Sequence, residues 1–229
     1  MRRALIPIGL LLLAACATPA TVPDTERARV DREIAGQQRY LRVAMYAGSL
    51  WSDTTKIFLT DQPGAELDLL EKGDGTPIPP PPPERVLAPG TAVRVRKVEF
   101  PTTWGIADRV MMTPRFNPWV YLDGPGDGRP YVLVLPRDMN RFDDVRAELD
   151  RVLTSDDPGG VFAGLPQDQR EAILRKQPIE GMGARALEMA WGLPERKRID
   201  RPAGTEEWIW PGGKRRAYLR DERVEKIER

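Results

Sequence analysis

The stretch WVYLDGPGDGRPYVLVL, residues 119–135, decides the fold class of this chain. Its two ends, Trp119–Leu122 and Tyr131–Leu135, are rich in β-branched and aromatic residues, which favour strands. The intervening Asp123–Gly128 contains three glycines and one proline and cannot continue a strand. The stretch therefore predicts an antiparallel hairpin.

Alternating apolar residues predict three more strands upstream of this hairpin. They are a segment that begins at Leu41, the run 56–60 and the run 92–100. Five short strands separated by Gly and Pro predict a small β-barrel or curled sheet within an N-terminal domain, residues 24–153. The segment Gly90–Val95 resembles bacterial SH3-like modules.

Two helices are expected at the two ends of this β-rich domain. Asp24 or Thr25 is the expected N-cap of the first, which continues to Ile34. The second has Asn140 as its expected N-cap. Its apolar residues repeat at helical spacing: Phe142, Val145, Leu149, Val152 and Leu153.

A break in periodicity separates this domain from the C-terminal part of the chain. Residues 154–165 contain Asp156-Asp157-Pro158-Gly159-Gly160, which cannot extend a helix, and we expect a linker there. In the C-terminal domain, residues 166–229, a helix over 167–177 is expected, with Lys176 on its solvent side. A second helix starts near Gly181 and stops at Gly192-Leu193-Pro194. Short strands are expected at 207–210, 216–219 and 224–227.

The C-terminal domain resembles the SmpA/OmlA (BamE-like) family of outer-membrane lipoproteins. The matching motifs are Ile179-Glu180-Gly181-Met182, Leu187, Gly192-Leu193-Pro194, Trp208-Ile209-Trp210 and Arg216-Ala217-Tyr218-Leu219. The chain departs from the family at Gly183, where a Thr or Ser is usual, and at Asp221-Glu222, where Asp-Gly is usual. The resemblance implies an α+β chain that ends in a helix-helix-strand-strand domain with a third short strand. It also implies partners among envelope proteins, including the outer-membrane assembly machinery.

The first residues resemble a bacterial lipoprotein signal peptide. Arg2 and Arg3 precede an apolar run, and Leu13-Ala14-Ala15-Cys16 matches the cleavage motif, so residues 1–15 are the expected leader. The resemblance implies that Cys16, the only cysteine, becomes an N-terminus acylated with palmitate or a similar chain. Two or three acyl chains hold a protein firmly on a membrane.

The residues after the cysteine indicate where the anchored protein resides. Ala17 stands where an aspartate would favour retention in the inner membrane. We therefore expect attachment to the outer membrane, with the body in the periplasm and residues 16–23 as an extended tether.

Composition excludes several classes of chemistry. The chain has no histidine, and its 35 basic and 34 acidic residues give a net charge of +1. Imidazole-based catalysis is absent, and nothing favours nucleic-acid binding. No nucleotide, cofactor or metal motif is present, so we expect a non-catalytic envelope scaffold or assembly accessory. The alternative is a glycan- or peptidoglycan-binding module or enzyme that uses carboxylates such as Asp53, Asp61 and Glu66.

Eight residues are candidates for contact with lipid or a partner protein: Arg196, Lys197, Arg198, Trp208, Trp210, Lys214, Arg215 and Arg216. The two basic clusters are either solvated surface or contacts for lipid phosphates. The two tryptophans share one face of a strand, so they form either part of the core or a recognition surface; we favour the core.

Overall fold

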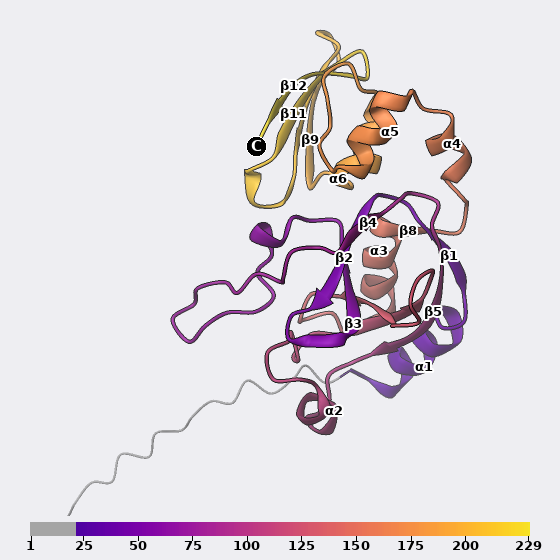
Figure 1. Cartoon of the computed structure of the whole chain (residues 1–229), viewed down its shortest axis with the longest axis vertical. Helices are drawn as coiled ribbons and strands as arrows, with labels where there is room; N and C mark the ends of the chain where they lie inside the picture. Colours follow the sequence, from indigo (N-terminus) through magenta and orange to yellow (C-terminus); the bar gives the residue numbers. More distant parts are fainter. Residues whose placement is uncertain (1–21) are drawn as a thin grey trace, which may run out of the picture.

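The computed structural model describes residues 22–229, which form an α+β structure with two separate sheets (Figure 1). The expected leader, Cys16 and most of the expected tether lie outside the described residues. Within the described part, no helix is long and apolar enough to cross a bilayer.

The N-terminal sheet is mixed and has eight strands. Their order is β4-β2-β3-β7-β6-β5-β1-β8, so β4 and β8 are its edges. The strands are β1 (Gln38–Leu41), β2 (Met45–Leu50), β3 (Asp53–Thr60), β4 (Arg85–Leu87), β5 (Ala92–Glu99), β6 (Trp119–Asp123), β7 (Tyr131–Val134) and β8 (Leu153–Thr154). The predicted hairpin is confirmed as the antiparallel pair β6–β7. The expectation of five strands is wrong. The short strands β4 and β8 carry little apolar alternation, and β1 and β2 lie where one strand was expected.

The single strand expected from Leu41 is in fact two strands. β1 ends at Leu41 and β2 begins at Met45. Between them the backbone makes contacts elsewhere: the N–H of Arg42 donates to the Val152 carbonyl, and that of Ala44 donates to the Met189 carbonyl. The apolar alternation continues through this break, which is why the sequence does not reveal it.

Three helices accompany this sheet: α1 (Asp24–Glu33), α2 (Thr103–Asp108) and α3 (Phe142–Val152). The expected caps of α1 and α3 are wrong. α1 follows Pro23, and the residue before α3 is Arg141; neither provides a side-chain cap. Instead the first N–H of α3 donates to Glu26 Oε2 at 2.6 Å, so a carboxylate of α1 caps α3.

Both faces of the eight-stranded sheet are covered. In β6, Val120 and Leu122 belong to the core that contains the apolar residues of α1 and α3, whereas Trp119 and Tyr121 belong to a second core on the opposite face. A strand buried on both sides needs apolar residues at every position. This explains the uninterrupted apolar run that starts at Trp119.

The C-terminal part contains three helices and a second sheet. The helices are α4 (Gly159–Ala163), α5 (Gln167–Leu174) and α6 (Ala184–Trp191), and α4 falls within the expected linker. The sheet is an antiparallel meander of β9 (Arg196–Asp200), β10 (Thr205–Ile209), β11 (Arg216–Arg220) and β12 (Arg223–Glu228). Two short 3-10 turns, η1 (Gly64–Glu66) and η2 (Pro211–Gly213), complete the described chain. Strand β9 was not expected, because all five of its residues are exposed.

The helices α5 and α6 cover one face of the second sheet. Leu187 and Trp191 of α6 are fully buried with Trp208, Trp210 and other apolar residues of this core. The rings of Trp191 and Trp210 meet edge to face, with centroids 4.9 Å apart. The core also contains Ala44 of the N-terminal domain, so the two domains pack directly against each other.

The turn between β11 and β12 is formed by Asp221 and Glu222 without a glycine. Asp221 and Glu222 have φ values of 48° and 61°. Two successive left-handed residues form the turn that suits a two-residue hairpin, a conformation that Asn and Gly adopt more readily. The hairpin therefore keeps its geometry without the usual glycine.

Candidate functional site

The outer face of the C-terminal sheet, on the side away from α5 and α6, carries charged residues in rows. Glu207 is paired in register with Arg198 on β9 and with Tyr218 on β11, and Tyr218 is paired with Lys226 on β12. Directly paired residues point to the same face of a sheet. One row of this outer face is therefore Arg198, Glu207, Tyr218 and Lys226.

Several of these charges neutralise one another. The Glu207 carboxylate accepts from Arg198 at 2.9 Å and from Arg216 at 3.2 Å. Lys226 donates to Glu228 at 2.6 Å, and this hydrogen bond lowers the pKa of the Glu228 carboxyl. Arg196 is exposed and has no ion-pair partner in the described part of the chain. Asp200 of β9 lies on the same face, so Arg196, Arg198 and Arg216 face Asp200 and Glu207, and the excess of one positive charge lies at the Arg196 end of β9.

Strand β9 is an open edge of this sheet. It pairs with β10 on one side, and no strand of the described residues pairs with its other side. Its Ile199 side chain is 55% exposed. An edge of this kind offers free backbone donors and acceptors to an extended segment.

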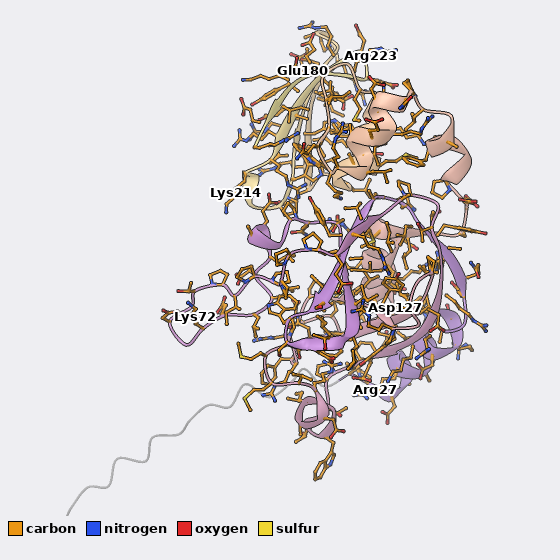
Figure 2. The ribbon with its side chains drawn as sticks, in the orientation of Figure 1. Arg27, Lys72, Asp127, Glu180, Lys214 and Arg223 are labelled. Atoms are coloured by element: carbon orange, nitrogen blue, oxygen red, sulfur yellow. The ribbon has the colours of Figure 1, made fainter. Side chains whose placement is uncertain are left out.

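The structure separates the eight predicted contact residues. Arg196, Arg198 and Arg216 share the outer face, and Lys214 is exposed in the turn between β10 and β11, where Figure 2 labels it. Lys197 lies 3.6 Å from the centroid of the Trp208 ring and is paired with Glu188 of α6.

The prediction of a contact role is wrong for three of the eight side chains. Trp208 and Trp210 are buried in the C-terminal core, as the favoured alternative for this pair expected. Arg215 is 4% exposed because it lies between the two domains. It cannot meet a lipid phosphate, and the six basic residues do not form one surface.

Arg215 forms one half of a buried ion pair that links the domains. Its Nε donates to Glu66 Oε2 at 2.9 Å, and its two Nη atoms are buried without a hydrogen-bond partner. Its guanidinium also lies 5.3 Å from the centroid of the Trp191 ring. Glu66, one of the candidate catalytic carboxylates, is therefore the counter-ion of Arg215.

Lys176 is a second buried cation at the same junction. Its Nζ donates to the Ala44 carbonyl at 2.6 Å, and its own carbonyl accepts from Trp191 Nε1 at 3.2 Å. Burial lowers the pKa of Lys176 to about 7, although Asp61 partly opposes this effect. The expectation that Lys176 faces solvent is wrong: the chain turns at this residue, with φ of 56°, and directs the side chain inward.

Gly192 shows how closely the two domains approach each other. This residue has φ of 83°, and a Cβ atom built on it would lie 2.4 Å from Asp61 Oδ2. Its carbonyl accepts from Trp210 Nε1 at 3.0 Å. Any other residue at this C-cap of α6 would have a strained backbone and would displace the Asp61 carboxylate of the N-terminal domain.

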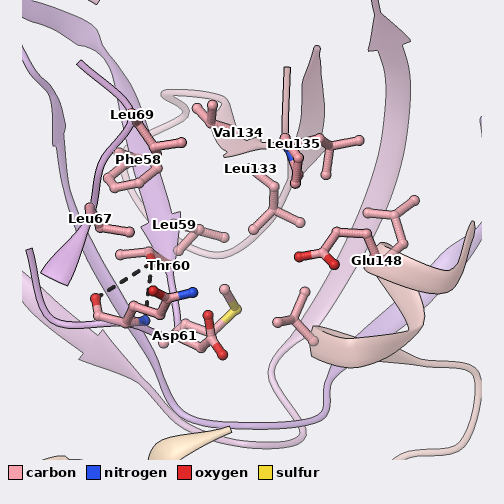
Figure 3. A pocket seen from close by; sticks show the side chains of 15 residues that line it. Phe58, Leu59, Thr60, Asp61, Leu67, Leu69, Leu133, Val134, Leu135 and Glu148 are labelled. Carbon is pink, nitrogen blue, oxygen red and sulfur yellow. Dashed lines mark hydrogen bonds between the residues drawn. The ribbon is translucent and has the colours of Figure 1, made fainter. Parts of the chain in front are cut away.

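Asp61 also borders a small pocket between β3, β7 and α3 (Figure 3). The lining is largely apolar, and Asp61 and Glu148 are its two carboxylate side chains. Its volume is about 130 Å³. Pockets that hold drug-sized ligands measure roughly 300–1,000 Å³, so a sugar ring with its neighbours does not fit.

Asp53, the remaining candidate carboxylate, is far from solvent. It is 4% exposed and accepts from Lys56 Nζ at 2.7 Å and from the Thr55 hydroxyl at 2.6 Å. Burial raises the pKa of Asp53, but these hydrogen bonds outweigh it and leave the pKa below its ordinary value. The pocket that Asp61 lines contains neither Asp53 nor Glu66.

Comparison with known proteins does not add a relative. No family model, curated protein or solved structure matches the chain. Its function must therefore be inferred from its own sequence and geometry.

Sequence reasoning missed the residues that join the domains, namely Ala44, Glu66, Lys176 and Arg215. Each lies in a segment whose local pattern predicts solvent exposure or an ordinary strand. The one local signal was Gly192 before Leu193-Pro194, which marks a helix end but does not indicate its partner.

Proposed function

We propose that this chain is a non-catalytic lipoprotein of the outer membrane that acts as an envelope scaffold or assembly accessory. Its BamE-like C-terminal domain holds an extended segment of another envelope protein on β9. The observation that carries this proposal is the open edge of β9, whose five residues are all exposed and whose Arg196 lies at its basic end.

The chemistry of β9 selects the class of partner. Backbone groups at an open edge pair with any extended chain, so side chains must provide the selectivity. Arg196 has no ion-pair partner in residues 22–229, and Arg198 is 61% exposed although it is paired with Glu207. An acidic extended segment would satisfy both side chains and bury Ile199.

The position of β9 in the molecule suits a tethered protein. The described chain begins at Val22 beside the N-terminal domain, and the C-terminal sheet lies at the opposite end of the molecule (Figure 1). If Cys16 is held at the membrane, this arrangement directs β9 into the periplasm. The helix-helix-sheet order is consistent with the family resemblance, although the sheet has four strands rather than two or three.

The small size of the Asp61–Glu148 pocket argues against glycan processing at that pocket. Glycoside hydrolysis requires two carboxyls on either side of a bound sugar, roughly 5–9.5 Å apart. The pocket has no room for such a ring. Asp53 forms an ion pair with Lys56, and Glu66 forms one with Arg215.

A photocrosslinking amino acid at position 199 tests the role of β9. In the full-length protein in its native envelope, we expect an adduct whose partner peptide is acidic and extended, as mapped by mass spectrometry. Leu174 on α5 is the matched control, because it is also an exposed apolar residue. The Arg196→Glu/Arg198→Glu double variant should lose the adduct. Equal yields at positions 174 and 199, or an adduct that survives the charge reversal, would contradict the proposal.

Lipidation of Cys16 is tested separately. The intact mass of the mature protein should equal that of residues 16–229 plus two or three acyl chains. Cys16→Ala should release the protein from the membrane or leave it uncleaved. A mature wild-type mass without acyl chains would refute the anchor.

A further inference from the structure

Exposed apolar side chains are concentrated in one loop of the N-terminal domain. Among residues 22–229, seven large apolar side chains are exposed, and five of them lie between β5 and β6. Trp104 is 83% exposed and Met111 is 73% exposed. We call this set the 104–116 patch: Trp104, Val110, Met111, Met112 and Phe116.

The backbone beneath the patch is firmly held from inside. Arg109 is 7% exposed, and its guanidinium donates to the carbonyls of Arg115 at 2.8 Å and Asn117 at 2.7 Å. It also pairs with Glu99 at 2.9 Å. These contacts fix both ends of the loop to the sheet.

Further hydrogen bonds hold the middle of the loop. The Thr102 hydroxyl caps α2 by accepting from the Gly105 N–H at 3.0 Å, and Trp119 Nε1 donates to the Pro114 carbonyl at 3.0 Å. Ser52 Oγ donates to the Met112 carbonyl at 3.1 Å. The loop therefore turns its polar groups inward and its apolar side chains outward, which is the reverse of an ordinary surface loop.

The α2 end of the patch lies close to the point where the described chain begins. The Val22 carbonyl accepts from Arg27 Nε at 3.3 Å, and the Arg27 guanidinium lies 5.9 Å from the centroid of the Phe100 ring. Phe100 is three residues before α2 (Thr103–Asp108). In Figures 1 and 2 the start of the chain, Arg27 and α2 lie at the same end of the molecule.

The length of the tether brings this end of the molecule to a membrane. Cys16 precedes Val22 by six residues. A fully extended chain spans at most about 3.6 Å per residue, so an acylated Cys16 lies within about 22 Å of Val22. The short tether keeps the neighbouring patch close to the bilayer surface.

The charges around the patch also suit a phospholipid surface. The guanidinium groups of Arg115 and Arg137 lie 5.8 Å and 5.4 Å from the centroid of the Phe116 ring. Asp108 is the only acidic residue within 103–116, and Asp68 and Glu71 line a hollow beside Met111, Arg115 and Arg137, so the basic and acidic groups at this edge are mixed. Arginines beside apolar side chains can meet lipid phosphates while the apolar side chains enter the interface.

We propose that the 104–116 patch is a second membrane contact, which inserts Trp104 and the methionines into the interface of the phospholipid layer that holds Cys16. This inference rests on the proposed lipidation, because the short tether is what selects a lipid surface over a protein as the occupant. The insertion fixes the orientation of the N-terminal domain, with the C-terminal sheet pointing away from the membrane.

Tryptophan fluorescence tests this contact directly. The chain has six tryptophans, and Trp104 is the only exposed one, because Trp51, Trp119, Trp191, Trp208 and Trp210 are each 6% exposed or less. The difference in emission between the lipidated full-length protein and Trp104→Phe therefore reports on Trp104. On vesicles of phosphatidylethanolamine and phosphatidylglycerol with brominated acyl chains, we expect a blue shift of this emission and loss of most of its intensity. Aqueous iodide should no longer quench it.

Control variants separate the patch from the anchor. Met111→Asp/Met112→Asp should return Trp104 to a water-exposed emission, whereas Leu174→Asp, at an exposed apolar residue of α5, should leave its emission unchanged. Flotation with the vesicles reports the anchor alone. Lipidated protein that floats while iodide still quenches Trp104 would overturn the patch proposal and leave the anchor intact. Trp104 shielded from both iodide and bromolipid would show a protein occupant and would also overturn it.

Discussion

The two sheets of this molecule are built in opposite ways. The N-terminal sheet pairs segments that are distant in sequence: β1 pairs with β8, and β3 is parallel to β7. The C-terminal sheet pairs each strand with the next one along the chain. A meander of this kind resembles an independent unit, yet its core includes Ala44 of the other domain. The comparison teaches that a simple topology does not make a domain energetically independent.

The junction decides whether the two domains unfold together. It contains two buried cations, Lys176 and Arg215, whose partners, the Ala44 carbonyl and the Glu66 carboxylate, belong to the other domain. Separating the domains would change the surroundings of every one of these groups. We therefore expect one cooperative unfolding transition for residues 22–229.

The largest effect is expected from Glu66→Ala. It leaves the Arg215 charge buried without its counter-ion, and losing one partner of a buried pair costs about 3–5 kcal/mol. Urea unfolding followed by tryptophan fluorescence measures this loss. The control is Glu66→Ala/Arg215→Met, which removes both charges and should recover much of the stability. A loss below about 0.5 kcal/mol for the single variant would show that the junction does not stabilise the fold.

Leu187→Ala weakens the core of the smaller, C-terminal domain and tests whether the two domains unfold together. Leu187 is fully buried, and truncation of a buried leucine costs about 2–5 kcal/mol. If the domains unfold together, the whole transition should move to lower urea. Leu59→Ala, in the core of the N-terminal domain, is the matched variant and should shift the same single transition. A second, earlier transition in the Leu187→Ala protein alone would show two independent domains.

Lys176 predicts a pH dependence of stability that belongs to the junction. Its pKa is about 7 in the folded protein, against an ordinary value of 10.5. Between these values the unfolded chain binds the extra proton, so the free energy of unfolding should rise with pH from about 7 to 10, by on the order of a few kcal/mol. Burial raises the pKa of Tyr46 above its ordinary value of 10.0, so this tyrosine does not change the free energy of unfolding between pH 7 and 10. In Lys176→Met, the urea midpoint of unfolding should not change between about pH 7 and 10. If the midpoint rises with pH equally in the wild-type protein and in this variant, groups other than Lys176 cause the pH dependence.

The smallest effect sharpens the comparison at a single contact. Gly192→Ala requires a left-handed alanine and places its Cβ against Asp61, whereas Gly36→Ala has the same φ requirement with no atom within 4 Å. The first substitution should cost about 1–3 kcal/mol and the second about 1 kcal/mol. The difference between their urea midpoints measures how tightly the domains are pressed together. Equal losses of unfolding free energy in the two variants would mean that Asp61 moves away from the new Cβ atom without destabilising the junction.

Local patterns predicted the elements whose partners are close in sequence. The hairpin at Trp119–Leu135 and the α3 stripe that begins at Phe142 follow from alternation, helical spacing and turn residues. The helix that contains Leu187 and its glycine stop were also predictable, because caps are local signals.

The remaining features depend on distant contacts. Nothing in the exposed residues of β9 distinguishes a strand from a solvated basic loop, because the neighbouring strand supplies its hydrogen bonds. Lys176 and Arg215 look like surface charges until the fold brings Ala44 and Glu66 to them. Glu26, which caps α3, accepts a hydrogen bond from the N–H of Phe142, which lies 116 residues later in the sequence. The positions of the candidate carboxylates Asp53, Asp61 and Glu66 relative to one another likewise depend on the fold and not on the local sequence.

The separation of paired residues also sets the order in which the chain can fold. β1 cannot complete its pairing before β8 is available, Ala44 meets a residue 132 positions later, and Glu66 meets one 149 positions later. Closing such long loops costs chain entropy before the native contacts repay it, and a high contact order slows folding. The N-terminal sheet should therefore remain incomplete, with unpaired strands, until β8 at Leu153–Thr154 is available, and its contacts with Lys176 and Arg215 form later still. A holding chaperone would then be needed more by the first half of the chain than by the second.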